Sequence, residues 1–216
     1  MKLGIPIYDG VNLLDVAGPL EMFFWASEQK PEFKPVLVSV DGYVVTSGNN
    51  VRFEAHASFA NTPTLDVVWV PGGMPDALVG IMKDPNSPYL NYLRQVAANA
   101  KWVCSVCEGA LLLARAGLLE GHKATTHWQF VKCLQRFPGI DVDTTYQRFV
   151  VSEKGAEKRL TGGGISSGLD ESLQLILLLF GEDVARSVQK ATQYFPEPPL
   201  PGKLTDKPPD CDIVWT

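Results

Sequence analysis

The sequence predicts an α/β fold in which helices cover both faces of a mostly parallel sheet. Short apolar runs rich in β-branched residues alternate along the chain with longer segments of helical periodicity. The short runs are apolar throughout rather than at every second residue, which is typical of strands buried on both faces. Glycine- and proline-rich turn signals end several of these strands, where a tight connection to the next element is required.

The first half of the chain alternates strands with helices. Each expected strand is a short apolar run, and turn residues follow it. The first expected helix carries Pro19 in its first turn, where a missing N–H leaves no hydrogen bond unmade. In chain order we expect a strand at 4–8, a helix at 20–26, a strand at 33–40, a hairpin at 44–53, a strand at 65–70, a helix at 88–100, a strand at 102–106 and a helix at 109–116.

The second half adds shorter strands and two strongly helical segments. In chain order we expect a helix at 128–137, strands at 142–146, 149–152 and 160–161, and helices at 169–180 and 182–194. The sequence shows no internal repeat and no boundary between domains. We therefore predict one domain over residues 1–194 and a Pro-rich C-terminal arm over 195–216.

Composition argues against several classes of protein. The net charge is −5 and no run of lysine or arginine occurs, so no nucleic-acid partner is expected. The longest apolar run, 173–180, is far below the roughly 20 residues of a membrane span, so no membrane partner is expected. The start of the chain does not resemble a secretory signal, which predicts a cytoplasmic protein. Its four cysteines are then expected to be reduced thiols: Cys104, Cys107, Cys133 and Cys211.

Cys107 is the candidate nucleophile. It lies in the segment Ser105-Val106-Cys107-Glu108-Gly109-Ala110, between an expected strand and an expected helix. That order is typical of a nucleophile elbow, a tight turn that lifts a side chain off the edge of a sheet. The N-terminus of a helix also favours the reactive thiolate. A free cysteine is more often a small core residue, but the strand–Cys–X–Gly–helix context favours the nucleophile.

Cys104 stands three residues before Cys107, a spacing found in redox and metal pairs. The sequence holds no second C-x-x-C and no H-x-x-x-H, and Cys104 falls within the expected strand. We therefore predict no metal site and assign Cys104 to the core, together with Cys133 on its helix. Cys211 lies in the arm, where it could be exposed.

Three further side chains are candidates for acid–base chemistry. Asp15 follows the first strand, so it is expected on the same edge of the sheet as Cys107, where it could shuttle a proton or simply cap a helix. Glu108 would oppose a thiolate if charged; it could instead be a protonated acid or face solvent. His127 could activate the cysteine as a base, bind the substrate or oxyanion, or cap the helix that it begins.

Glycines at the strand ends are candidates for binding an anion that develops during a reaction. Gly72 and Gly73 end one strand, and their N–H groups could act together with that of Glu108. Gly163, in the run 162–164, is assigned to the same role of substrate or oxyanion binding. The run is not followed by the Lys-Ser or Lys-Thr pair of a phosphate-binding loop, so we predict no cofactor.

Five segments carry a resemblance to a known family: 14–19, 70–73, 105–109, 124–128 and 160–164. Together they resemble the DJ-1/PfpI (ThiJ) superfamily over nearly the whole chain. The run 162–170 and the Glu-Pro-Pro at 197–199 look most similar to its isocyanide (isonitrile) hydratase branch, but that branch has threonine where this chain has Glu108.

The resemblance implies a flavodoxin-like sandwich related to class I glutamine amidotransferase domains, usually a homodimer. The implied activity is cofactor-free hydration of an isocyanide, a small-molecule substrate, to an N-substituted formamide. Cys107 would attack the terminal carbon to give a covalent thioimidate, and Asp15 would position or protonate the substrate and later help water attack. His127 matches a family position, but the resemblance does not make it the base.

Two other functions stay open from the sequence. One is a glyoxalase-like activity on small α-oxoaldehydes, which also occurs in the superfamily. The other is a cysteine redox or stress sensor, because an accessible cysteine of low pKa oxidises readily. Some relatives form the ligand-binding half of transcription regulators, but this chain lacks the length for a helix-turn-helix region and has no basic patch.

Overall fold

A seven-stranded sheet forms the centre of the computed structural model, which describes residues 1–200 and 202–215. The strand order is β10-β11-β7-β6-β1-β2-β5, and every neighbouring pair is parallel except β10 and β11. The predicted, mostly parallel sheet is therefore confirmed. Its strands are β1 (Lys2–Pro6), β2 (Lys34–Ser39), β5 (Ala57–Ser58), β6 (Val67–Val70), β7 (Trp102–Ser105), β10 (Phe149–Lys154) and β11 (Glu157–Gly162).

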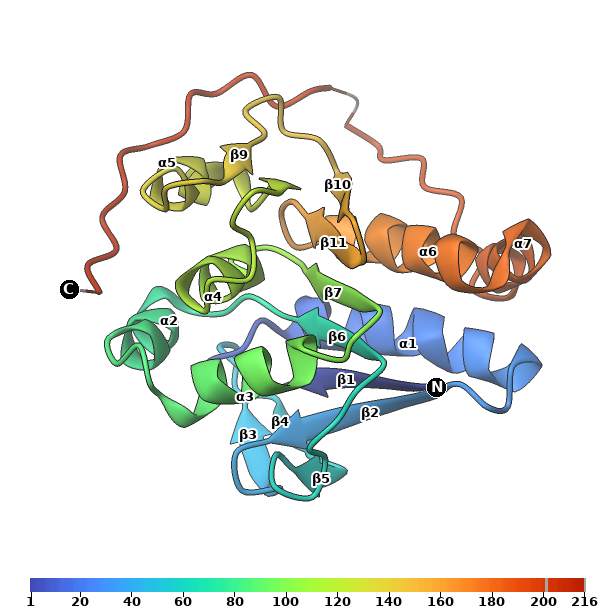
Figure 1. The fold of residues 1–216 in the computed structure, drawn as a ribbon. Coiled ribbons are helices and arrows are strands. Elements are labelled where there is room, and N and C mark those ends of the chain that lie inside the picture. The colour runs from blue at the N-terminus through green and yellow to red at the C-terminus, as the bar shows by residue number, and fades with distance from the viewer. Residues whose placement is uncertain (201, 216) are drawn as a thin grey trace.

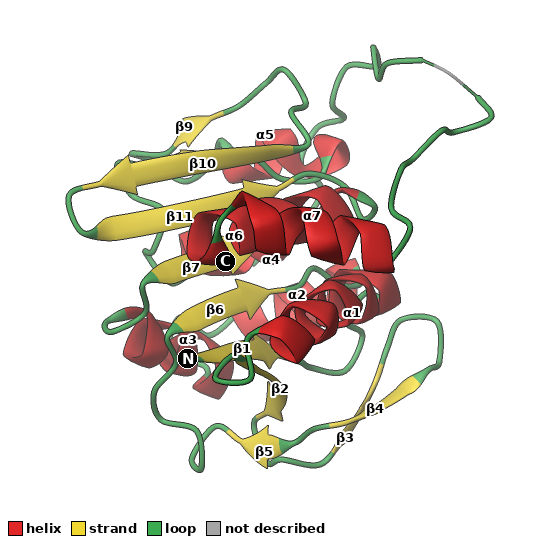
Figure 2. Ribbon diagram, turned by 90° about the vertical axis from the view of Figure 1, so that its right-hand side faces the viewer, coloured by secondary structure: helices red, strands yellow, loops and turns green. Residues whose placement is uncertain are grey.

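Helices cover both faces of this sheet, as Figures 1 and 2 show. One face carries α1 (Leu13–Gln29), α6 (Ser167–Phe180) and α7 (Glu182–Ala191), which pack on one another. The other carries α2 (Pro75–Met82), α3 (Pro88–Ala97) and α4 (Gly109–Arg115). This is the flavodoxin-like sandwich that the sequence predicts. None of the helices in the described part of the chain is both long and apolar enough to cross a membrane.

Smaller elements extend the sandwich at its edges. The predicted hairpin is present as β3 (Val44–Thr46) and β4 (Arg52–Glu54), while β8 (Lys123–Ala124) and β9 (Asp141–Val142) form a short parallel pair. A 3₁₀ turn, η1 (Trp128–Phe130), leads into α5 (Val131–Leu134). Between 195 and 215 the described residues form neither helix nor strand, and the arm runs from the end of α7 past α5 (Figure 1). Pro201 and Thr216 of the predicted arm lie outside the described residues.

The first helix differs from the prediction in a way that has a physical cause. It begins at Leu13 rather than at residue 20, so Pro19 lies inside it. Proline has no N–H, and the carbonyl four residues earlier, that of Asp15, therefore loses its usual helical partner. The indole Nε1–H of Trp69 donates to that carbonyl instead, at 3.2 Å. A side chain from β6 thus completes a helix that sequence rules would begin at the proline.

Other boundaries differ as well. The helix expected at 128–137 is shortened to η1 and α5, and the strand expected at 142–146 shrinks to the two residues of β9. Helix α2 was not predicted, although Pro75 stands in its first turn, where proline is favoured. These short elements are held by tertiary packing rather than by their own periodicity.

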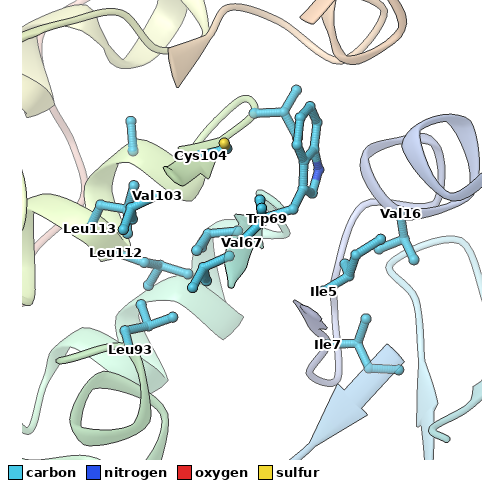
Figure 3. Close-up of a cluster of buried hydrophobic side chains, with 14 of the residues drawn as sticks. Ile5, Ile7, Val16, Val67, Trp69, Leu93, Val103, Cys104, Leu112 and Leu113 are labelled. Atoms are coloured by element: carbon cyan, nitrogen blue, oxygen red, sulfur yellow. The ribbon is translucent and has the colours of Figure 1, made fainter. Parts of the chain in front are cut away.

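The core lies between the sheet and the two helix layers. Figure 3 shows side chains of β1, β6 and β7 between Val16 of α1 on one side and Leu93 of α3 with Leu112 of α4 on the other. Trp69 and Cys104 in this cluster are fully buried, so the assignment of Cys104 to the core is confirmed. The central strands β1, β6 and β7 are buried on both faces apart from Lys2 at the start of β1, which explains why they are otherwise almost entirely apolar.

The prediction that all four cysteines are reduced is wrong for one pair. Cys133 of α5 and Cys211 of the arm form a disulfide, while Cys104 and Cys107 are free. The two partners are 78 residues apart. They meet because the arm folds back and buries Trp215 against Phe137, with the two rings stacked at 5.3 Å. Nothing in the local sequence of either cysteine indicates this pairing.

Candidate functional site

The turn between β7 and α4 presents Cys107. Its φ angle is +57°, in the left-handed region that non-glycine residues rarely adopt, so the turn is strained as a nucleophile elbow requires. Two hydrogen bonds hold it: the Cys107 N–H donates to the carbonyl of Gly163 at 2.9 Å, and Thr126 Oγ1 donates to the Cys107 carbonyl at 2.8 Å. Both partners come from distant segments, so tertiary structure maintains the strain.

Glycine at position 109 is required by close packing. A Cβ there would lie 2.1 Å from the carbonyl oxygen of Val70. We expect Gly109→Ala to lower the free energy of unfolding by about 1–3 kcal/mol or more, because β6 and the elbow must move apart. Gly80→Ala is the matched control, since a Cβ there meets nothing within 4 Å and alanine favours a helix. Urea unfolding measures both; equal stability of the two variants would contradict the packing argument.

Three acidic groups meet at the elbow. One ligand atom each from Asp15, Cys107 and Glu108 lies within 4.8 Å of the others, and all three residues are buried. Asp15 comes from the first turn of α1 and Glu108 from the N-terminus of α4. The parallel strands bring these helix starts to one edge of the sheet, as expected. The structure thus brings together the three residues that we assigned to catalysis from the sequence.

Asn12 connects the members of this cluster, and the sequence analysis missed it. Its Nδ2 donates to Glu108 Oε2 at 3.2 Å and lies 3.9 Å from Cys107 Sγ. Its backbone N–H donates to the Gly72 carbonyl at 3.0 Å, which fixes the start of α1 against the end of β6. A polar residue just before a helix is an ordinary cap signal, so only the fold distinguishes Asn12 from a cap.

Burial raises the pKa of all three groups in the cluster. It is the main cause that raises the pKa of the Cys107 thiol well above its usual value, and the carboxyls of Asp15 and Glu108 raise it further. Burial, then the Glu108 carboxyl, raises the pKa of Asp15 to about 8, and burial also raises the pKa of Glu108. The expectation that the helix N-terminus favours a thiolate is therefore wrong, because burial and two acidic neighbours raise the pKa of this thiol.

The glycines expected to bind an anion use their N–H groups within the protein. Gly72 donates to Asp15 Oδ2 at 2.9 Å, Gly73 bonds the Glu108 carboxyl, and Gly163 donates to the Arg148 carbonyl at 2.9 Å. A Cβ on Gly72 would lie 2.4 Å from Glu108 Oε2 and 2.9 Å from Asp15 Oδ2. Gly72 and Gly73 therefore orient the two acids, and an open oxyanion site does not form at these donors.

His127 lies beside the site rather than in it. Its Nδ1 accepts from the Gln129 N–H at 3.3 Å, so it caps η1, and its ring packs against Gly164. Burial lowers the pKa of its imidazole. The hydrogen bonds found among the described residues include none from His127 to Cys107. The capping alternative therefore describes its geometry, and the neighbouring Thr126 contacts the nucleophile's backbone instead.

A third buried carboxyl, that of Glu171, lies near the cluster. Glu171 of α6 is fully buried, and neither carboxyl oxygen has a hydrogen-bond partner among the described residues. Burial, and then the nearby Asp15, raises the pKa of Glu171 well above its usual value. A Cβ on Gly162 would lie 2.0 Å from Glu171 Oε2, so the glycine leaves room for this carboxyl. The apolar periodicity of the predicted helix gives no signal for a buried acid.

An apolar hollow of about 420 Å³ opens next to Asn12. Its walls include three large apolar side chains that are unusually exposed: Leu14 at 41%, Met74 at 48% and Ile165 at 42%. No ionisable side chain lines it. The lining residues are Asn12, Leu13, Leu14, Ala17, Gly48, Asn49, Met74 and Ile165. Asn12, which lines this hollow, also lies with its Nδ2 3.9 Å from Cys107 Sγ, whereas Cys107 itself is buried behind it.

A cysteine on a strained strand-to-helix turn, between two buried carboxyls at the carboxyl edge of a parallel sheet, defines an α/β protein of the nucleophile-elbow class. The DJ-1/PfpI family model matches residues 1–156. The chain belongs to the DJ-1/PfpI family, as its motifs predict.

Several known proteins are similar over most of the chain. An isonitrile hydratase from Pseudomonas putida is 35% identical over 214 residues, which are 99% of this chain and 87% of that protein. A crystal structure of a ThiJ/PfpI family protein from Pseudomonas syringae is 30% identical with a TM-score of 0.80, covering 92% of this chain and 77% of the other. The transcriptional regulator GbdR from Pseudomonas aeruginosa is 26% identical over 89% of this chain, which spans 50% of the regulator.

Proposed function

We propose that this protein is a cofactor-independent hydratase that converts isocyanides to N-substituted formamides through a covalent intermediate on Cys107. One observation carries the proposal: the thiol of Cys107 and the carboxyls of Asp15 and Glu108 are buried together within 4.8 Å. A buried cluster suits an uncharged substrate, because a charged one would lose its solvation on entry. The similarity to an isonitrile hydratase supports the same substrate class.

The first half-reaction adds the thiol across the terminal carbon of the isocyanide. Asp15 gives its proton to that carbon, which makes it electrophilic, and Cys107 Sγ forms the new bond to it. The thiol proton passes to the carboxylate that Asp15 has become, so the acid is restored. The product is a thioimidate, R–N=CH–S–Cys107. Keeping both groups protonated at rest serves this step, because it needs an acid and a neutral thiol together.

The second half-reaction releases the formamide. Asp15 protonates the imine nitrogen, and its carboxylate then accepts a proton from the water that attacks the thioimidate carbon. The C–S bond breaks, the sulfur regains its proton, and R–NH–CHO leaves. All atoms of the product come from the isocyanide and water, so no metal or organic cofactor is required. Asn12 and Glu108 act as positioning residues, since they hydrogen-bond each other beside the thiol.

The apolar hollow provides a place for the substituent R. It is uncharged and adjoins Cys107 through Asn12, so an alkyl or aryl group would be buried there while the isocyanide carbon meets the sulfur. Burial of such a group contributes roughly 25 cal/mol per Å² of apolar surface. The site therefore favours an apolar substituent over a charged one.

A steady-state assay on a panel of alkyl and aryl isocyanides tests the proposal, with the formamide identified by mass spectrometry. Absence of turnover across the panel would exclude this substrate class. Lactate formed from methylglyoxal would instead favour the glyoxalase-like alternative. The sensor alternative requires Cys107 to oxidise under mild peroxide, which the raised pKa of its thiol disfavours.

The rate is expected to fall as pH rises above about 8, because Asp15 must be protonated and its pKa is about 8. The same shift predicts a stability effect. The folded protein keeps this proton between about pH 4 and 8, whereas the unfolded chain releases it, so the free energy of unfolding should fall across that range. In Asp15→Asn the contribution of this group to the pH dependence of the free energy of unfolding should be lost. An unchanged slope in the variant would show that Asp15 is not protonated in the folded protein.

Glu108→Thr places the residue of the hydratase pattern beside the nucleophile. The Glu108 carboxyl is the largest electrostatic cause of the raised Asp15 pKa after burial. Its removal should lower that pKa and move the alkaline fall in rate to lower pH. Glu120→Thr, on the surface, is the control and should leave the pH profile in place. The dependence of kcat/KM on pH is measured for both variants. If the alkaline fall in rate stays at the same pH in Glu108→Thr, Glu108 does not raise the pKa of Asp15.

A further inference from the structure

The C-terminal arm is fastened to α5 at several points. Lys132 Nζ pairs with Asp210 at 2.7 Å, and Arg136 Nη1 donates to the Ile213 carbonyl at 3.0 Å. Trp215 is buried between the ring of Phe137 and the guanidinium of Arg136, which lies 4.7 Å from the ring centre. The arm is therefore docked rather than loose, although no helix or strand forms in its described residues.

The disulfide is the strongest of these fastenings. The Lys132–Asp210 pair is largely exposed, and exposed ion pairs add little to stability. By contrast, the bond between Cys133 and Cys211 closes a segment of 78 residues, and such a long closed loop loses much of its freedom when unfolded. Whether the arm stays docked therefore depends chiefly on the oxidation state of this pair.

We propose that Cys133 and Cys211 form a site of reversible exchange with a low-molecular-weight thiol, and that this exchange controls docking of the arm. Cys211 is partly exposed whereas Cys133 is buried, so an incoming thiolate reaches the sulfur of Cys211 first. Arg136 Nη1 lies 3.5 Å from that sulfur, and a guanidinium there stabilises a thiolate. Two acidic residues flank Cys211 in the sequence. Asp210 is paired with Lys132, so the exposed Asp212 is the neighbour whose charge opposes a thiolate at Cys211.

The exchange balances in two steps. The external thiolate forms a bond to Cys211 Sγ while the bond to Cys133 breaks, and Cys133 leaves as a thiolate that takes a proton from water. A second external thiol then attacks the mixed disulfide, and Cys211 leaves as a thiolate beside Arg136. Two external thiols are oxidised to one small disulfide, and the protein pair gains their two electrons; of the two protons that the external thiols lose, one is taken up by Cys133 and the other stays in solvent while Cys211 remains a thiolate.

Release of the arm would change the surroundings of the elbow. Residues 202–204 form one wall of a second hollow of about 630 Å³, whose other walls include Thr126 and Gly163. Those two residues hold the backbone of Cys107. Under this proposal, reduction of the distant pair releases one wall of a hollow that borders the supports of the nucleophile. This inference does not depend on which substrate Cys107 attacks.

Glutathione buffers of graded redox ratio, followed by alkylation and peptide mass mapping, test the exchange. We expect Cys133 and Cys211 to become alkylated together as the buffer becomes reducing, while the protein stays folded by circular dichroism. The proposal is overturned if the two cysteines are alkylated in oxidising buffer, or if they resist reduction until the protein unfolds. Cys104→Ala is the control for cysteine content. In this variant Cys133 and Cys211 should become alkylated at the same glutathione redox ratio as in the wild type.

Trypsin tests the docking separately, because Lys203 in the arm precedes Leu204 and is a cleavage site. Cleavage there should be about tenfold faster in reduced than in oxidised wild type, and equally fast in both buffers for Cys211→Ser. Lys132→Gln, which removes a contact to the arm but none to sulfur, should keep the redox difference. Equal cleavage rates for oxidised and reduced wild type would show that the disulfide does not control the arm.

Discussion

Replacement of Cys107 by alanine is expected to abolish formamide production from isocyanides. The variant lacks the sulfur that forms the thioimidate, so only uncatalysed hydration of a bound substrate would remain. Loss of a catalytic nucleophile lowers kcat by on the order of 10⁴- to 10⁶-fold in enzymes with a comparable covalent step. Steady-state formamide production measures the loss, and intact mass after substrate addition should show no adduct on the variant.

Cys104→Ala is the matched control for this experiment. Cys104 is also a free, buried cysteine, but it packs in the core on β7 and is not part of the elbow cluster of Asp15, Cys107 and Glu108. Its replacement should lower stability modestly through the small cavity that it leaves, and it should leave kcat within a few-fold. Full activity of Cys107→Ala would disprove covalent catalysis at this residue, whatever the substrate.

The second large effect is expected for Asp15→Asn, with a loss of about 10²- to 10⁴-fold in kcat/KM. This range is typical of removing a general acid or base. The asparagine Oδ1 can still accept from the Gly72 N–H, as Asp15 Oδ2 does at 2.9 Å, so the site should keep its shape. What the variant lacks is the exchangeable proton that both half-reactions use. Protonation of the terminal carbon, and hence thioimidate formation, should become the slow step.

Asp183→Asn, at the exposed start of α7, is the control for removing one carboxyl charge and should leave kcat/KM unchanged. Single-turnover mass spectrometry separates the two half-reactions. A thioimidate that forms at the normal rate on Asp15→Asn and then persists would restrict Asp15 to the hydrolysis step. Normal turnover throughout would remove Asp15 from the mechanism.

Much of the fold could be predicted because its strands are buried on both faces. Continuous apolar runs such as 67–70 and 102–105 are visible in the sequence, and parallel strands place the turns after them on one edge. The strand–Cys–X–Gly–helix order is local too, so the elbow at Cys107 follows from it. The homodimer and the cytoplasmic location stay predictions.

By itself, then, the sequence determined the α/β class, the family motifs and the position of the elbow, because each depends on neighbouring residues and their periodicity. Tertiary structure decided the start of α1, where the Trp69 indole replaces the N–H that Pro19 lacks. It also decided the charge state of the site: burial and the approach of Asp15 and Glu108, residues 93 positions apart in the chain, keep Cys107 a thiol. Pairing of Cys133 with Cys211 depends likewise on how a distant arm docks. These features arise from contacts between remote segments, which local pattern does not encode.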